Sequence, residues 1–126
     1  MQKISQSEQE IMVYIWDNDS PVVLKNIVDH FALSRSWSKS TTHTLLSRLV
    51  GKGYLSLTKD KTNFYTPIIH RGEYSALQST SALEGLYQGS VKNFLAAFYG
   101  GNPLPKKDIE ELKEFIKQYD EVEKDE

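Results

Sequence analysis

The stretch that decides the fold is WSKSTTHTLLSRLVGKGYL, residues 37–55. Its first half is crowded with hydroxyl side chains, a His and basic groups, whereas its second half is rich in leucine. Ser, Thr and His are mediocre residues for a helix interior, so local helical stability does not explain the run STTHT. The composition indicates that the exposed surface of this segment serves another purpose.

The same stretch separates cleanly on a helical wheel at about 100° per residue. Ser38 is the expected N-cap. The arc predicted to enter a core contains Thr42, Leu45, Leu46, Leu49 and Val50. The other side carries Ser40, Thr41, His43, Thr44, Ser47, Arg48 and Lys52. We therefore expect an amphipathic helix that offers short donors and acceptors near its start and cations further on.

Two more amphipathic helices are predicted before this one. In the first, Ser5 followed by Glu8 fits a capping box. Its apolar residues at helical spacing are Ile11, Met12, Ile15 and Trp16. After a break at residues 18–21, VVLKNIVDHFAL is predicted to form the second helix. Its apolar face contains Leu24, Ile27, Val28 and Phe31.

A β-hairpin is predicted after the third helix. Tyr54, Leu55 and Leu57, and then Phe64 and Tyr65, suit strands, and the polar loop TKDKTN joins them. Three helices followed by a hairpin is the order of a winged helix-turn-helix. The expected fold class is mostly α with a small β-hairpin, a winged helix-turn-helix followed by a C-terminal helical dimerisation region.

The chain after residue 70 contains three more predicted helices with apolar faces. About 50 residues are too few to bury all three faces alone, so the faces either fold back on the N-terminal half or, as we expect, pair with a second copy. We predict domains at residues 1–70 and 71–126. The predicted dimer interface consists of Val91, Phe94, Leu95, Phe98, Ile109, Leu112 and Ile116.

The composition excludes several classes of protein. Apolar residues make up 39% of the 126 residues and charged residues 25%, which is ordinary for a soluble domain. The absence of Cys excludes disulfides, thiolate metal sites and Cys nucleophiles. No apolar run approaches the roughly 20 residues that span a bilayer, and the N-terminus has no signal-peptide core. We expect a cytoplasmic protein.

A local basic stretch indicates an anionic partner. The net charge is −2, but residues 35–61 hold six basic residues and only one acidic residue, Asp60. Clustered cations in an acidic chain favour nucleic acid on one face, although a solvated surface is the alternative. In a helix-turn-helix, the second helix of the motif lies in the major groove, where hydroxyls and Arg meet base edges or phosphates. The predicted DNA contacts are Lys39, Ser40, Thr41, His43, Thr44, Arg48, Lys59 and Lys61.

Other functions have weaker support in the sequence. No GxSxG or SxxK motif is present, and Gly51 and Gly53 end a helix instead of starting one, so we expect neither an enzyme nor a cofactor. His30, His43 and His70 lack the spacing of metal ligands. Trp16 and Trp37 are interpreted as packing residues. A winged helix that binds a protein, without sequence-specific DNA binding, remains the alternative function.

Three segments carry a resemblance to a known family. ISQSEQEIMVYIW, WSKSTTHTLLSRLVGKGYL and LYQGSVKNFLAAF, in this order, resemble the penicillinase-repressor family of bacteria, which includes the BlaI, MecI and CopY repressors. The resemblance covers roughly residues 4 to 119. It implies a winged helix, a C-terminal dimerisation region, and a homodimer that represses transcription from a palindromic operator. It also implies operator contacts at Ser40, Thr41, Thr44 and Arg48, with His43 near the groove.

The chain departs from the family in three places. The family often has Pro-Lys where this chain has Lys39-Ser40, which displaces the lysine by one residue. The paired cysteines of the copper-responsive branch are missing, so that metal switch cannot operate. The antibiotic-resistance repressors are cleaved at an Asn-Phe bond, and the corresponding pair here is Ala97-Phe98. A sensor protease partner is therefore left open, and no β-lactam role is carried over.

Overall fold

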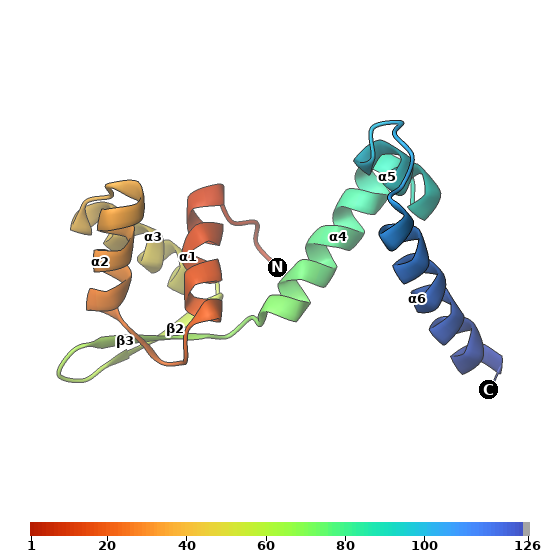
Figure 1. Cartoon of the computed structure of the whole chain (residues 1–126). Coiled ribbons are helices and arrows are strands. Elements are labelled where there is room, and N and C mark those ends of the chain that lie inside the picture. Colours follow the sequence, from red (N-terminus) through yellow and green to blue (C-terminus); the bar gives the residue numbers. More distant parts are fainter. Residues whose placement is uncertain (125–126) are drawn as a thin grey trace. The chain divides into compact units, whose positions relative to one another are not determined.

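The computed structural model describes residues 1–124 as two compact units (Figure 1). The first unit is Met1–Gln78, and the second begins at Ser79. The division falls within one helix, so the domain boundary expected after residue 70 stays a prediction. The elements are α1 (Gln6–Asp17), β1 (Val22–Val23), α2 (Leu24–Arg35), α3 (Lys39–Gly51), β2 (Leu55–Lys59), β3 (Asn63–Pro67), α4 (Arg71–Tyr87), α5 (Val91–Phe98) and α6 (Lys106–Lys124).

The first unit confirms the winged-helix expectation. Helices α1, α2 and α3 precede a hairpin of β2 and β3, whose strands pair antiparallel from Leu55 opposite Pro67 to Lys59 opposite Asn63. The predicted loop TKDKTN is therefore shorter than expected, because its first two residues and its last belong to the strands. In Figure 1 the hairpin runs out from the three helices as a single wing.

The predicted start of the second helix was wrong by two residues. Val22 and Val23 form the short strand β1, which pairs antiparallel with Tyr65 and Phe64 of β3. The sheet order is β1-β3-β2, and α2 begins only at Leu24. The physical reason is that β-branched residues suit a pleated, half-buried surface, and β3 supplies that surface from a distant part of the sequence.

The core of the first unit is built from the predicted apolar faces. The buried apolar residues are Ile11, Met12, Ile15, Val22, Ile27, Phe31, Leu45, Leu46, Leu49, Tyr54, Leu55, Tyr65 and Tyr74. Both tryptophans pack against this core, as predicted. Trp16 Nε1 donates to the carbonyl of Ile69 at 3.0 Å.

The first turns of α4 also belong to this unit. Tyr74 is buried, and its hydroxyl donates to Oε1 of Gln9 at 2.8 Å. Arg71 forms an ion pair with Asp17 at 2.5 Å. The beginning of α4 is therefore held against α1 by a buried tyrosine and by an ion pair.

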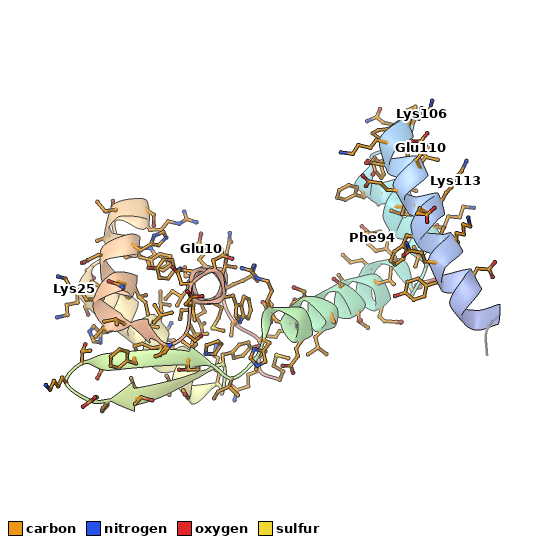
Figure 2. All side chains as sticks on the ribbon, turned by 60° about the horizontal axis from the view of Figure 1, so that its bottom comes forward. Glu10, Lys25, Phe94, Lys106, Glu110 and Lys113 are labelled. Atoms are coloured by element: carbon orange, nitrogen blue, oxygen red, sulfur yellow. The ribbon has the colours of Figure 1, made fainter. Side chains whose placement is uncertain are left out.

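The second unit holds the rest of α4 together with α5 and α6. The ring of Tyr87 meets Phe94 edge-on at 5.6 Å, and the hydroxyl of Tyr99 donates to Asp108 at 2.6 Å. Gly100 and Gly101, which follow the end of α5, have positive φ angles. Charged residues Lys106, Glu110 and Lys113 follow one another along α6 (Figure 2). None of the residues of α5 is buried in this single chain.

Candidate nucleic-acid interface

Ser38 sets the start of helix α3. Its Oγ accepts from the backbone N–H of Thr41 at 3.1 Å and donates to Oγ1 of Thr41 at 3.0 Å. This side chain satisfies one of the backbone donors that every helix start leaves without an intrahelical partner. The helix therefore begins at Lys39, and its first turn, which attracts anions through its N–H groups, lies at the surface.

The two sides of α3 separate as the helical wheel predicted. Thr42, Leu45, Leu46 and Leu49 are buried, and Val50 is half-buried. His43 is half-buried as well. The exposed residues of the helix include Lys39, Ser40, Thr41, Thr44, Ser47 and Arg48. The predicted contact residues on this helix are therefore on its outer surface, with His43 at the edge.

Two threonines on this surface have hydroxyls with opposite hydrogen-bonding roles. Thr44 Oγ1 donates its hydrogen to the carbonyl of Ser40 at 3.0 Å, so toward an outside ligand its oxygen acts as an acceptor. Thr41 Oγ1 accepts from Ser38, which leaves its own hydrogen free to donate. The helix thus offers one acceptor and one donor a single turn apart.

Ion pairs within the first unit neutralise two of the six basic residues counted in residues 35–61. Arg35 pairs with Glu10, and Lys52 pairs with Glu8. Among the described residues, the basic side chains of this stretch that have no carboxylate within ion-pair distance are Lys39, Arg48, Lys59 and Lys61. All four are among the residues predicted to contact DNA, and the sequence counts alone did not separate them from Arg35 and Lys52.

The tip of the wing carries two of these cations. Lys59 is the last residue of β2 and lies opposite Asn63, while Lys61 lies in the turn. The turn is closed by a bond from the N–H of Asp60 to the carbonyl of Thr62 at 3.0 Å. Lys59 and Lys61 are both exposed, so the wing presents two positive charges on a short, hydrogen-bonded loop.

The three histidines lie on different parts of the fold. The ring of His30 stacks on Tyr14 at 4.3 Å, His43 lies on α3, and His70 directly precedes α4. Among the side chains that the structure describes, residues 1–120, no three of His, Asp or Glu gather as a metal ion requires. Within the same range, no helix combines the length and the apolar composition needed to cross a bilayer.

The second unit leaves most of its predicted interface residues in solvent. Phe98 is 71% exposed, Ile116 62% and Val91 60%. Leu95 and Leu112 are half-buried, and the remaining members of the predicted set, Phe94 and Ile109, are exposed. The prediction did not include three further exposed apolar or aromatic residues, Leu86, Phe115 and Tyr119. The bond between Ala97 and Phe98 lies in the last turn of α5.

Comparisons with known proteins cover almost the whole chain. The sequence profile of the family described as penicillinase repressor matches residues 4–118. The penicillinase repressor of Bacillus licheniformis is 30% identical over 118 residues, which cover 93% of this chain and 91% of the relative. The methicillin resistance regulatory protein MecI of Staphylococcus aureus (strain N315) is 27% identical over 115 residues, covering 90% of this chain and 93% of the relative.

Two solved structures resemble more than half of the chain. The DNA-binding domain of the repressor BlaI matches with a TM-score of 0.52 and 33% identity, over 59% of this chain and 94% of that one. The monomeric form of Bacillus licheniformis BlaI, in complex with the blaP half-operator, matches with a TM-score of 0.51 and 32% identity, over 58% and 89%.

Proposed function

The chain belongs to the penicillinase repressor family, and we propose that it acts as a homodimer that reads a palindromic operator with one α3 helix from each copy. It is a DNA-binding transcriptional repressor, and its family is not one of enzymes. The observation that carries the proposal is the exposed surface of α3 in a unit that resembles a repressor bound to a half-operator. This surface carries hydroxyl groups and two cations, Lys39 and Arg48, that have no ion-pair partner among the described residues.

The side chains of α3 divide between the two kinds of DNA contact. Arg48 offers a planar fork of donors, which matches the O6 and N7 atoms of guanine or a phosphate. Thr44 offers an acceptor for an exocyclic amino group and a methyl group for thymine. Lys39 and Thr41 are assigned to phosphate oxygens, because they lie in the first turn of the helix.

The wing supplies contacts of the phosphate type. Lys59 and Lys61 are exposed cations on a hairpin loop, and lysine acts on DNA mainly as a point charge. Contacts of this kind raise affinity for every sequence and carry no base information. Specificity is therefore assigned to α3, and the wing is assigned to general affinity.

A selection experiment tests the DNA-reading part of the proposal. The purified protein is enriched against a randomised duplex pool, and binding to the winning sequence is followed by fluorescence anisotropy. We expect Arg48→Ala and Thr44→Ala each to weaken specific binding by about 1–3 kcal/mol. Lys107→Ala, which removes an exposed cation from α6, is the matched control and should bind as the wild type does. Unchanged operator affinity in both α3 variants would remove α3 from the interface.

The dimer is assigned to the second unit. A chain that leaves Phe98, Ile116 and Val91 more than half exposed carries a larger apolar surface than a stable monomer normally keeps in water. A second copy that covers the predicted interface removes this surface from water. The proposed interface is Val91, Phe94, Leu95, Phe98, Ile109, Leu112 and Ile116, extended by Leu86, Phe115 and Tyr119.

Sedimentation velocity tests the dimer separately from DNA reading. We expect a dimer for the wild type at micromolar concentration and a monomer for Phe98→Asp. Leu33→Asp is the control, because Leu33 is 90% exposed but lies on α2 in the first unit. Phe98→Asp should keep its affinity for a half-site and lose affinity for the full palindrome. A wild-type protein that sediments as a monomer would contradict the proposed dimer.

A further inference from the structure

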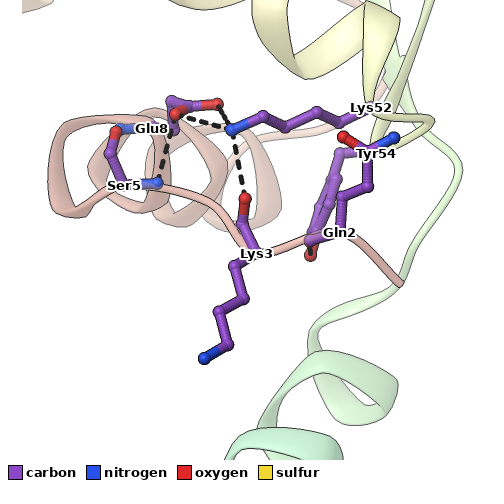
Figure 3. Close-up of polar contacts among 6 residues, drawn as sticks. All are labelled: Gln2, Lys3, Ser5, Glu8, Lys52 and Tyr54. Carbon is purple, nitrogen blue, oxygen red and sulfur yellow. Dashed lines mark hydrogen bonds and ion pairs between the residues drawn. The ribbon is translucent and has the colours of Figure 1, made fainter.

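A set of polar contacts fastens the start of the chain to the segment that joins α3 to β2 (Figure 3). Lys52 Nζ lies 3.0 Å from each carboxylate oxygen of Glu8 and donates to the carbonyl of Lys3 at 3.1 Å. The hydroxyl of Tyr54 donates to the carbonyl of Gln2 at 2.6 Å. The partners are 44 to 52 positions apart in the sequence, so the contacts are tertiary.

The Glu8 carboxylate contacts both segments that meet here, namely the start of α1 and the end of α3. Its Oε1 accepts from the backbone N–H of Ser5 at 3.1 Å, which is one half of the capping box of α1. The residue is only 2% exposed. A buried carboxylate needs a paired cation and hydrogen bonds, because desolvation of an unpaired charge is costly. The Lys52 ammonium is therefore held at a defined place beside the first turn of α1.

The ammonium of Lys52 is engaged within the first unit. A lysine ammonium carries three N–H donors and no acceptor. Two of them bond to Oε1 of Glu8 at 3.0 Å and to the carbonyl of Lys3 at 3.1 Å, and Oε2 of Glu8 lies 3.0 Å from Nζ as an ion-pair partner that accepts no hydrogen bond. This engagement separates Lys52 from Lys59 and Lys61, which have no such partners among the described residues.

The contacts sit at the joint between the two proposed DNA-binding elements. Lys52 is the C-cap of α3, and its backbone N–H bonds to the carbonyl of Arg48 at 2.9 Å. Tyr54 directly precedes β2, the first strand of the wing. A functional group keeps its productive geometry only when its supporting contacts hold it within about 0.5 Å. A fixed joint therefore fixes both α3 and the wing relative to α1.

We propose that Lys52 is a positioning residue for operator reading, which acts through Glu8 and the Lys3 carbonyl and makes no phosphate contact. The inference rests on the proposed function, since it concerns how well α3 reads an operator. It gives this lysine a role different from that of the other cations in residues 35–61. Glu8 belongs to the same set of contacts, although DNA repels its negative charge.

The test compares two variants on two DNA duplexes over a range of KCl concentrations. Lys52→Met should lower operator affinity about tenfold and leave binding to an unrelated duplex unchanged. Its slope of log K against log salt should equal that of the wild type, because no phosphate contact is lost. Lys59→Ala, which also removes one positive charge, should lower the magnitude of the slope by about 0.9 and weaken binding to both duplexes alike.

Glu8→Gln is the second variant and removes no cation. Simple electrostatics predicts tighter DNA binding for it, because one negative charge is gone, whereas a positioning role predicts weaker operator binding with an unchanged salt slope. Thermal melting by circular dichroism establishes that each variant is folded at the assay temperature. If Lys52→Met does not fold, Glu8→Gln carries the test.

Two outcomes would overturn the inference. A salt slope that drops by about 0.9 in Lys52→Met makes Lys52 a phosphate contact, and full operator affinity in a folded Lys52→Met or Glu8→Gln variant makes the contacts purely structural. A wild-type protein with no operator preference is a different result, which refutes the proposed function and is visible before any variant is measured.

Discussion

The indole of Trp37 lies almost parallel to the ring of Phe31, with the ring centroids 4.8 Å apart and the planes at 15°. The backbone N–H of Trp37 donates to the carbonyl of Phe31 at 3.2 Å, so the two residues are joined through both side chain and main chain. Trp37 lies in the turn between α2 and α3. The stack therefore holds the turn of the helix-turn-helix, and with it the start of α3.

We expect Trp37→Ala to destabilise the first unit by about 2–3 kcal/mol, since a half-buried aromatic contact and its area are lost. Trp37→Phe keeps a ring against Phe31 and should recover most of this loss. Urea unfolding followed by circular dichroism measures both variants. A loss below about 0.5 kcal/mol for Trp37→Ala, typical of an unimportant surface position, would show that the stack does not hold the turn.

The starts of α1 and α3 were predictable because their capping signals are local. Ser38 and Thr41 bond within one turn, and so do Ser5 and Glu8. The strand β1 was not predictable in this way. Two valines are too few for a periodic pattern, and their pairing partners in β3 lie about forty positions further along the chain.

The electrostatics of the candidate interface were only partly predictable, for a related reason. Counting charges in residues 35–61 gives every cation equal weight. The structure pairs Arg35 with Glu10 and Lys52 with Glu8, and both carboxylates come from α1. Tertiary pairing of this kind has no signal in the local composition, so the distinction between free and engaged cations required the fold.

Thr42 gives a prediction about stability. Its side chain is fully buried, and its Oγ1 has no hydrogen-bond partner within the described part of the chain. A buried hydroxyl without a partner carries a desolvation cost. Valine has nearly the same shape and a similar helix propensity. We therefore expect Thr42→Val to raise the free energy of unfolding by about 1 kcal/mol.

The exposed Thr44 serves as the control for this substitution. Its hydroxyl is bonded to Ser40 and faces solvent, so Thr44→Val should give no gain in stability. Chemical denaturation of the two variants side by side separates burial from helix propensity. Destabilisation by Thr42→Val would show that the buried hydroxyl is satisfied in solution. The Thr42→Val variant should bind DNA as the wild type does, because Thr42 faces the core.

The Glu8 carboxyl gives a prediction about pH. Burial raises the pKa of Glu8, but hydrogen bonds from Lys52 and Ser5 and the positive charge of Lys52 outweigh it and hold the pKa below its ordinary value. A carboxyl with a lower pKa in the folded state stabilises the protein fully above its unfolded pKa. That stability is lost as the pH falls through the folded pKa. We expect acid to weaken the first unit by this route.

Glu8→Gln isolates this contribution. The free energy of unfolding is measured for wild type and variant between pH 7 and pH 3. Their difference should stay constant above about pH 5 and shrink below it, because the wild-type carboxylate becomes neutral there. A difference that grows toward acid would mean that the folded pKa is raised instead, with desolvation stronger than the contacts from Lys52.

The wing gives a prediction about salt. Replacing both Lys59 and Lys61 by Ala should lower the magnitude of the slope of log K against log salt by about 1.8, since each phosphate contact contributes about 0.9. Operator and unrelated duplexes should lose affinity equally, and the preferred bases should not change. Asp60→Asn, in the same loop, is the control. It removes a negative charge between the two lysines and should slightly strengthen binding to both duplexes. A change in base preference in the double variant would move part of the sequence reading from α3 to the wing, because cations that contact only phosphates cannot distinguish one base pair from another.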